Sequence, residues 1–182
     1  MAIRSSFSQH NLFEKCARWW YFQYIQRLPV SSDMSYAHAG NAIHKTLQQY
    51  YDGKVSDVEK IKEIFSNYWE GYKLHQGKLN LKKDEYWLMI LNGLNLKLEV
   101  TSTELKIFYP EVVGYLDVVN TQTDEIGDWK SSKRSEDNEK EYKKQLMLYA
   151  WIYHRKFERV PNKVTVYYLR YNGTKGELYA FL

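Results

Sequence analysis

The hydrophobic positions in the first half of the chain recur at helical spacing. Ser8 can cap a first helix, whose apolar residues follow three or four positions apart. Ser56 and Glu59 form a capping-box pattern in front of another helix. The apolar stripes are Leu12, Phe13, Cys16, Trp19 and Trp20 in the first helix, and Val58, Ile61, Ile64, Phe65 and Tyr68 in the other. We therefore expect helices after Ser8, over 40–51, after Ser56 and over 84–98.

The period changes in the second half of the chain. The segments TELKIFY, VVGYLDVV and EIGDWKSS alternate and are rich in β-branched and aromatic residues, which predicts three short strands within 101–131. A charged helix is expected over 136–157. A last hairpin is expected from KVTVYYLRY and ELYAFL, joined by NGTKG, whose Asn-Gly is a strong turn signal.

This order of elements predicts one domain. The 182 residues fit a domain that buries roughly 70% of its unfolded surface and needs no disulfide. Helices followed by strands, a long helix and more strands are typical of the α/β (α+β) class. We expect a single domain over 1–182, mainly helical at 1–98, with the sheet and the long helix at 99–182.

Two acids meet if GYLDVVNTQTDEIGDWK forms a hairpin. A turn centred between Gln122 and Thr123, where turn formers lie, places Asp117 opposite Asp128. Directly opposed residues point to the same face, with Cβ atoms about 4.5–5.5 Å apart. Two carboxylates that close repel each other unless a cation or a proton lies between them. Lys130 follows Asp128 by two positions and therefore shares that face.

The strand before this hairpin adds a third acid. A turn centred on Pro110 and Glu111 places Glu104 opposite Asp117. A solvated surface sheet, which is the alternative, would alternate the sign of its charges, because like charges directly opposed are destabilising. The other face would carry an apolar set that suits packing on a helix, namely Leu105, Ile107, Leu116, Val118 and Trp129, while Val119 and Ile126 would extend the acidic face.

Paired carboxylates beside a lysine suit hydrolysis of a phosphodiester. Mg²⁺ prefers one or two carboxylates together with waters and phosphate oxygens. An ion held in this way can activate water, polarise the phosphoryl oxygen and orient an in-line attack. A nearby lysine can help to deprotonate the water or neutralise charge in the transition state.

At these residues the sequence resembles the PD-(D/E)XK nuclease superfamily, and within it the RecB-type exonuclease branch. The signature there is an Asp in a G-x-x-D strand followed by D/E-x-K in the next strand. Asp117 stands in GYLD, and Asp128, Trp129 and Lys130 form DWK. The D-x-K motif alone is weak, and further matches in the right order make the resemblance specific.

Four such matches span the chain from Ser6 to Tyr149. GNAIH resembles a family helix whose histidine helps to bind metal, which here is His44, and Glu104 resembles the acid before the G-x-x-D strand. QLMLYA resembles the Q-x-x-x-Y helix, with Gln145 and Tyr149 on one helical face. SFSQHNLFEKCARWWYFQY is similar to the N-terminal segment of the family. A core histidine and an ordinary amphipathic helix are the alternatives, and neither explains the matched context.

The resemblance implies a restriction-endonuclease-like core, a central mixed sheet flanked by helices, with an added N-terminal helical region. It also implies a role for each matched residue. Metal ligands would be His44, Asp117, Asp128 and the Trp129 carbonyl, with Glu104 on a second ion or its waters, Lys130 acting on the water or the transition state, and Gln145 and Tyr149 orienting the lysine and the substrate.

Cys16 is the one cysteine of the chain. CRISPR-associated RecB-like exonucleases and AddB-type nuclease domains hold an iron–sulfur cluster with one N-terminal and three C-terminal cysteines. Cys16 matches the first and the other three are absent, so no such cluster is expected in one chain. We expect Cys16 to be a core residue. This favours a small stand-alone nuclease of a phage or an archaeal virus over the cluster-bearing relatives.

Composition adds little to this hypothesis. A net charge of +4 is compatible with a polyanionic partner. The 17 Tyr, 6 Trp and 7 Phe either fill the core or in part stack on nucleobases. Basic residues at 78–83 and 133–134 either contact phosphate or form solvated surface. No apolar run approaches the roughly 20 residues of a membrane span, and MAIRSSFSQHN lacks the features of a signal peptide, so we expect a soluble cytoplasmic protein.

The sequence thus predicts a deoxyribonuclease that depends on Mg²⁺ or Mn²⁺ and acts as an exonuclease on DNA ends or single strands. A sequence- or structure-specific endonuclease would use the same residues. An inactive DNA- or protein-binding subunit is the third alternative, and its usual mark, loss of an acid or of the lysine, is absent. A homo-oligomer or a recombination or processing partner is compatible with the sequence.

Overall fold

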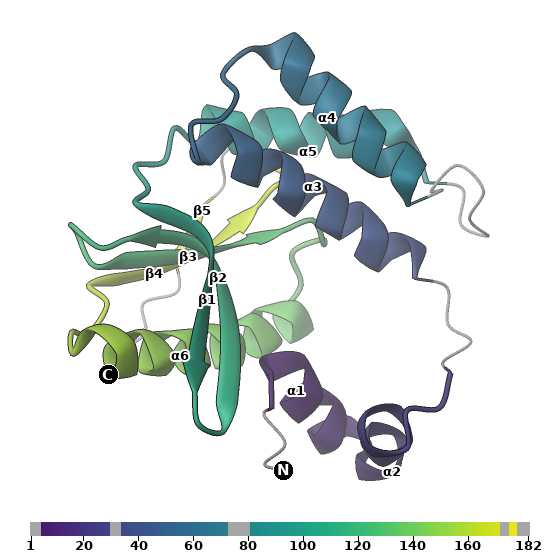
Figure 1. Ribbon diagram of the computed structural model, residues 1–182, viewed down its shortest axis with the longest axis vertical. Coiled ribbons are helices and arrows are strands. Elements are labelled where there is room, and N and C mark those ends of the chain that lie inside the picture. Colours follow the sequence, from purple (N-terminus) through teal and green to yellow (C-terminus); the bar gives the residue numbers. More distant parts are fainter. Residues whose placement is uncertain (1–4, 30–33, 73–80, 172–174, 178–182) are drawn as a thin grey trace.

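A computed structural model of the protein describes residues 5–29, 34–72, 81–171 and 175–177 (Figure 1). Its helices are α1 (Phe7–Lys15), α2 (Ala17–Trp20), the π-helix η1 (Tyr21–Ile25), α3 (Ser35–Tyr51), α4 (Val58–Gly71), α5 (Lys83–Asn95) and α6 (Glu136–Phe157). Its strands are β1 (Ser102–Tyr109), β2 (Val112–Asn120), β3 (Glu125–Lys130), β4 (Lys163–Tyr168) and β5 (Lys175–Glu177). Among the described helices, none is both long and apolar enough to cross a membrane.

The strands form one mixed sheet. The order is β1-β2-β3-β4-β5, with β3 and β4 parallel and the other neighbours antiparallel. A parallel pair needs a long crossover, and α6 supplies it between β3 and β4. The α+β class and the central mixed sheet predicted from the sequence are confirmed.

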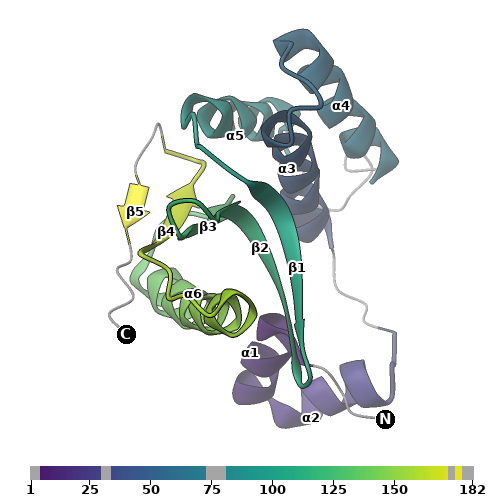
Figure 2. The same ribbon diagram turned by 60° about the vertical axis from the view of Figure 1, so that its left-hand side comes forward.

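Two hydrophobic clusters hold the helices on the sheet. One joins α3, α4 and α5 to side chains that include Val118 and Trp129. The other joins α6 to side chains that include Leu116 and Ile126. Figure 2 shows α3, α4 and α5 on one side of the strands and α6 on the other. The sheet therefore lies between two helical layers, each with its own apolar core.

Several predicted boundaries are wrong by a few residues. The cap of α1 is Ser6, whose Oγ accepts a hydrogen bond from the Gln9 amide, and not Ser8. The cap of α4 is Asp57 and not Ser56, because the Asp57 carboxylate accepts from the Lys60 amide at 2.9 Å, and a negative charge at this position also favours the helix dipole. The helix expected over 40–51 begins at Ser35, and the one expected over 84–98 spans Lys83–Asn95.

The last hairpin also differs from its prediction. Lys175 and Gly176, expected in the turn, belong to β5 and pair with Tyr167 and Val166. The other turn residues, 172–174, and most of the predicted second strand, 178–182, lie outside the described residues.

The three N-terminal helical elements contain no buried residue. Cys16 is exposed, so the expectation of a core position is wrong. Its Sγ instead caps α2 by accepting from the Trp19 amide. Ser5 pairs with Val112 beside the β1–β2 hairpin. These elements therefore lie at the edge of the fold and add nothing to its two cores.

Candidate active site

The register of the first three strands determines which acids come together. Thr103 pairs with Val118 and Leu105 with Leu116 in one ladder, and Val118 pairs with Gly127 in the next. These are the registers that the predicted turn centres required. Asp117 and Asp128 lie one position beyond the last β2–β3 pair, at the point where the strands begin to separate.

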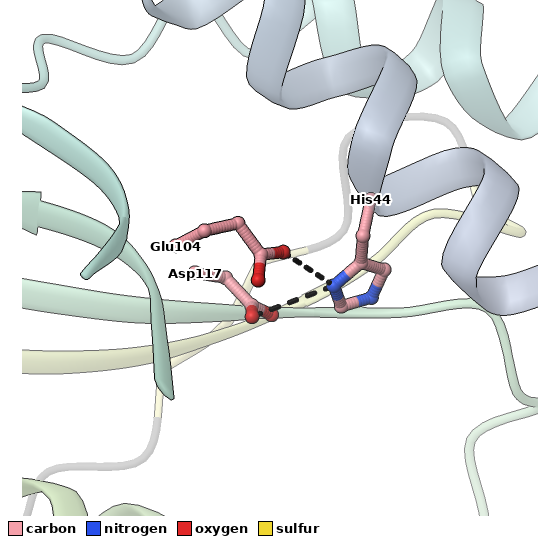
Figure 3. A group of neighbouring side chains, drawn as sticks. All are labelled: His44, Glu104 and Asp117. Atoms are coloured by element: carbon pink, nitrogen blue, oxygen red, sulfur yellow. Dashed lines mark hydrogen bonds and ion pairs between the residues drawn. The ribbon is translucent and has the colours of Figure 1, made fainter. Parts of the chain in front are cut away.

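Glu104 interrupts the β1–β2 ladder. It has a φ of 49°, in the left-handed region that residues with a side chain rarely adopt, and pairing skips it. Such a backbone costs on the order of 1–2 kcal/mol and persists only where its surroundings hold it. Here the carboxylate of Glu104 is directed at His44 of α3 (Figure 3).

His44, Glu104 and Asp117 form a compact cluster. The Nδ1 atom of His44 lies 3.3 Å from Glu104 Oε1 and 3.4 Å from Asp117 Oδ1. One ligand atom from each residue lies within 4.8 Å of the others, which is close enough for one metal ion. Asp117 is buried, whereas the side chains of His44 and Glu104 are 25% and 16% exposed, so the cluster is partly open to solvent.

The main chain of Trp129 closes this cluster. Its amide donates to Asp117 Oδ2 at 2.8 Å, and its carbonyl oxygen lies 3.0 Å from His44 Nε2. A carbonyl can only accept, so Nε2 carries a proton, while Nδ1 faces two carboxylates. Burial lowers the pKa of His44, but the Asp117 carboxylate and hydrogen bonds to Asp117 and Glu104 raise it to about 10. Without metal, His44 is therefore an imidazolium that holds the acids together.

A second group of side chains meets on the side of α6. Lys130 Nζ lies 2.6 Å from Asp128 Oδ2 and donates to Gln145 Oε1 at 2.8 Å. The amide nitrogen of Gln145 donates to Asp128 Oδ1 at 3.2 Å and to the Tyr149 hydroxyl at 2.7 Å. One glutamine amide thus fixes both the acid and the lysine, and its own orientation is fixed by the tyrosine one turn later.

The two groups are electrostatically linked. Burial raises the pKa of Asp128, Lys130 lowers it and Asp117 raises it, with a result of about 6. Burial lowers the pKa of Lys130, but the Asp128 and Asp117 carboxylates reverse this and raise it above its ordinary value. Lys130 is therefore charged at neutral pH. The carboxylates of Asp117 and Asp128 repel each other, although each has its own hydrogen-bond partners.

The predicted division of the sheet into one acidic and one apolar face is wrong. Leu105, Ile107 and Leu116 pack against α6, but Val118 and Trp129 pack in the α3–α5 core. Val119 and Ile126, expected beside the acids, belong to the α6 core. Strict alternation fails because the left-handed Glu104 interrupts the ladder opposite Asp117. The acids consequently face both helical layers.

Tyr142 lies at the site although the sequence analysis does not predict it as a site residue. Its ring centroid lies 4.5 Å from Lys130 Nζ, and its hydroxyl is 2.5 Å from Ser132 Oγ. The signal that identifies it is spacing: Tyr142 precedes Gln145 by three positions and Tyr149 by seven, so all three lie on one face of α6.

The predicted phosphate-contacting lysines and arginine are partly neutralised. Lys82 pairs with Glu85 at 3.6 Å and Lys83 with Glu70 at 3.4 Å. Arg134 pairs with Glu139. Residues 78–80 lie outside the described residues. The described part of this basic set therefore gives no specific support for phosphate contact.

The donor atoms of the site fit a hard divalent cation. The set is rich in carboxylate oxygens with a single imidazole, which suits Mg²⁺ or Mn²⁺ rather than a thiophilic metal. Asp128 Oδ2 is buried and lies 2.6 Å from the Lys130 ammonium, which balances its charge.

Comparison with known proteins agrees with this geometry. A family model described as the PD-(D/E)XK nuclease superfamily matches residues 4–180. No curated protein sequence matches the chain. The match covers the helix with His44, the three strands with the acids and the helix with Gln145, and the chain therefore belongs to the PD-(D/E)XK nuclease superfamily.

Proposed function

We propose that the protein is a DNA exonuclease of the RecB-type branch, dependent on Mg²⁺ or Mn²⁺, that acts on DNA ends or single strands. One observation carries its chemistry: the partly buried Lys130–Gln145–Asp128 group lies directly beside the His44–Glu104–Asp117 cluster. Membership of a nuclease superfamily makes DNA the expected substrate.

The residues present suggest a division of labour. His44, Asp117, Asp128 and the Trp129 carbonyl would hold the ion, with Glu104 on its waters or on a second ion. When bound, the cation supplies a Lewis acid for the phosphate group and for water. Lys130 would place a positive charge at Nζ against the charge that develops on the phosphate, or help a water molecule to lose its proton.

Gln145 and Tyr149 would act through Lys130. Because Lys130 Nζ donates to Gln145 Oε1 at 2.8 Å, the ammonium has a fixed position before substrate arrives. Holding a catalytic group in its reactive position removes orientational entropy from the reaction step. Burial and the nearby acids raise the pKa of Tyr149, so its hydroxyl stays protonated.

A nuclease assay tests the proposal. Linear end-labelled DNA and closed circular DNA, each single- and double-stranded, are incubated with Mg²⁺, Mn²⁺ or EDTA. Lys130→Met is expected to lose cleavage, since the substitution removes the ammonium and keeps an unbranched side chain of similar length. Lys156→Met is the matched control, because Lys156 is exposed at the far end of α6.

Metal-dependent loss of linear substrate alone would support an exonuclease, and the label released first would give its polarity. Cutting of circles would instead assign an endonuclease to the same residues. Full activity of Lys130→Met, or cleavage that persists in EDTA, would contradict the proposal.

A further inference from the structure

We infer that the N-terminal arm, defined here as α1, α2 and η1 (7–25), is a stacking surface for the single-stranded DNA that flanks the active site. The inference rests on the proposed function, since it extends the DNA path of that same site. Three features carry it: exposed aromatic rings, basic residues with no acid after Glu14, and attachment beside the site.

The arm presents aromatic rings to solvent. Trp19 is 50% exposed and Tyr21 is 44% exposed, and the arm buries no residue. Its own shape is fixed by Trp20, whose ring meets Phe13 edge-on at 5.3 Å and Tyr24 at 6.5 Å. These contacts of Trp20 fix the backbone on either side of it, which carries Trp19 and Tyr21, and the Tyr21 ring also lies 6.1 Å from that of Phe22. Such rings suit stacking on unpaired bases, which show a π-face whatever their sequence.

The charge of the arm favours a polyanion. The arm contains Lys15 and Arg18 and a single acid, Glu14, Arg27 lies two residues beyond its end, and no acidic residue occurs from Lys15 to Ser32. The guanidinium of Arg18 lies 5.5 Å from the ring centroid of Phe22, so a cation lies against an aromatic ring of the arm. Arginine next to exposed rings is the pattern that contacts phosphate and base together.

The arm is attached to the part of α6 that forms the active site. Lys15 Nζ pairs with Glu141 at 2.9 Å, and Lys144 pairs with Glu14 at 2.8 Å. These α6 residues stand on either side of Tyr142, and Lys144 directly precedes Gln145. Figure 1 shows α1 at the end of α6 where that helix begins. A strand that left the site past this end of α6 would therefore run toward the arm that carries the exposed rings.

Fluorescence polarisation in EDTA tests this surface without cleavage. The probes are a labelled oligothymidylate of about 15 nucleotides, within the usual size of such sites, and an abasic strand of equal length and charge. Trp19→Ala/Tyr21→Ala is expected to weaken binding of the oligothymidylate about tenfold or more, since each stacked base contributes about fivefold or more in affinity and two rings are removed. The abasic strand is expected to bind weakly to both proteins.

Matched variants separate stacking from other effects. Trp19→Phe/Tyr21→Phe keeps the rings and is expected to restore most of the affinity. Trp151→Ala removes an equally exposed ring, 42% exposed, that packs on Tyr109 at the other end of α6, and is expected to bind normally. Circular dichroism checks that each variant is folded.

Equal affinity of the double alanine variant and the wild type for the oligothymidylate would overturn the inference. So would a concentration-dependent dimer that the same substitutions dissociate, because the arm would then be a contact between copies of the chain. A negative result in this binding assay does not change the result of the cleavage assay. If instead the wild type binds DNA through the arm and shows no metal-dependent cleavage, only the proposed function is contradicted.

Discussion

The ammonium of Lys130 lies 4.5 Å from the centre of the Tyr142 ring. The tyrosine is held in turn by its hydroxyl, 2.5 Å from Ser132 Oγ. Asp128, Gln145 and Tyr142 thus constrain the lysine from three directions. Two of these contacts are polar and come from residues that the family motif contains. The third contact is with the face of the Tyr142 ring, which attracts the ammonium electrostatically and does not take its proton.

Tyr142→Leu is expected to reduce kcat about 5- to 30-fold with little change in KM, because loss of a partly buried cation–π contact of about 1–2 kcal/mol lets the lysine leave its position. Tyr142→Phe keeps the ring and should stay close to wild type. Steady-state kinetics on a labelled single strand would measure both. Tyr115→Leu removes another ring beside a lysine, Lys106, away from the site and serves as the control. Equal losses in the phenylalanine and leucine variants would assign the effect to the hydroxyl.

Metal binding is expected to release a proton from His44. Its pKa in the folded, metal-free protein is raised to about 10, whereas an unfolded histidine titrates near 6.5. At pH 8 the imidazole is therefore charged, and it must lose its proton before it can ligate an ion. Affinity for Mn²⁺ should rise up to about tenfold per pH unit between pH 7 and 9. Calorimetric titration in buffers of different ionisation enthalpy would show close to one proton released per ion.

The raised pKa of His44 also predicts how the stability of the metal-free protein depends on pH. Because the folded state holds the proton more tightly, this contribution to the free energy of unfolding is complete below about pH 6.5 and is lost as the pH rises toward 10. The slope is at most about 1.4 kcal/mol per pH unit for one proton. His44→Asn should flatten this dependence in urea titrations. Buffer-independent heats of Mn²⁺ binding would show that His44 is neutral or is not a ligand.

Glu104→Gly is expected to be more stable than Glu104→Ala by about 1 kcal/mol. Both variants lose the carboxylate, so the comparison isolates the backbone, and glycine alone adopts a φ of 49° without strain. Urea denaturation of the two metal-free proteins would measure the difference. A more stable alanine variant would mean that this residue has an ordinary β conformation.

Gly114→Ala is expected to destabilise the protein by about 1–3 kcal/mol. A methyl group at Gly114 would come within 2.1 Å of Ile152 Cδ1 and 3.6 Å of Tyr149 Cε1, and Ile152 is fully buried. The glycine of the GYLD segment therefore lets α6 approach the sheet. Thermal unfolding would measure the loss, with Gly71→Ala as the control, since a methyl group there meets no heavy atom of the described residues within 4 Å. A stable Gly114→Ala variant would show that α6 shifts easily.

The strand register could be predicted from the sequence because the relevant signals are local. Turn-forming residues around Gln122 and Thr123 fix one hairpin, and a turn at Pro110 and Glu111 fixes the other. The ladders Val118↔Gly127 and Leu105↔Leu116 confirm both predicted turns. The roles of the matched residues remain predictions, although the structure brings all of them into two adjoining groups.

Other features depend on neighbours that the sequence does not identify. The left-handed Glu104 is held by contacts with a helix about 60 positions earlier in the chain, as the His44–Glu104 contact shows. The caps of α1 and α4 were misassigned because Ser6 and Ser8, or Ser56 and Asp57, compete at neighbouring positions and local chemistry barely separates them. In the sequence, Tyr142 is one aromatic residue among others on an amphipathic helix, and only its contact with Lys130 in the structure distinguishes it.

The position of the site between two helical layers has a consequence for the newly made protein. His44 is on α3, whereas Gln145 and Tyr149 are on α6, about 100 residues later in the chain. A ribosome must therefore release the chain past residue 149, and both apolar cores must form, before the lysine has its glutamine partner. An incomplete or half-folded chain carries the acids without an ordered lysine. Among the described elements, α6 is the last helix in the chain, so a partly synthesised chain cannot yet hold Lys130 in its position in the site.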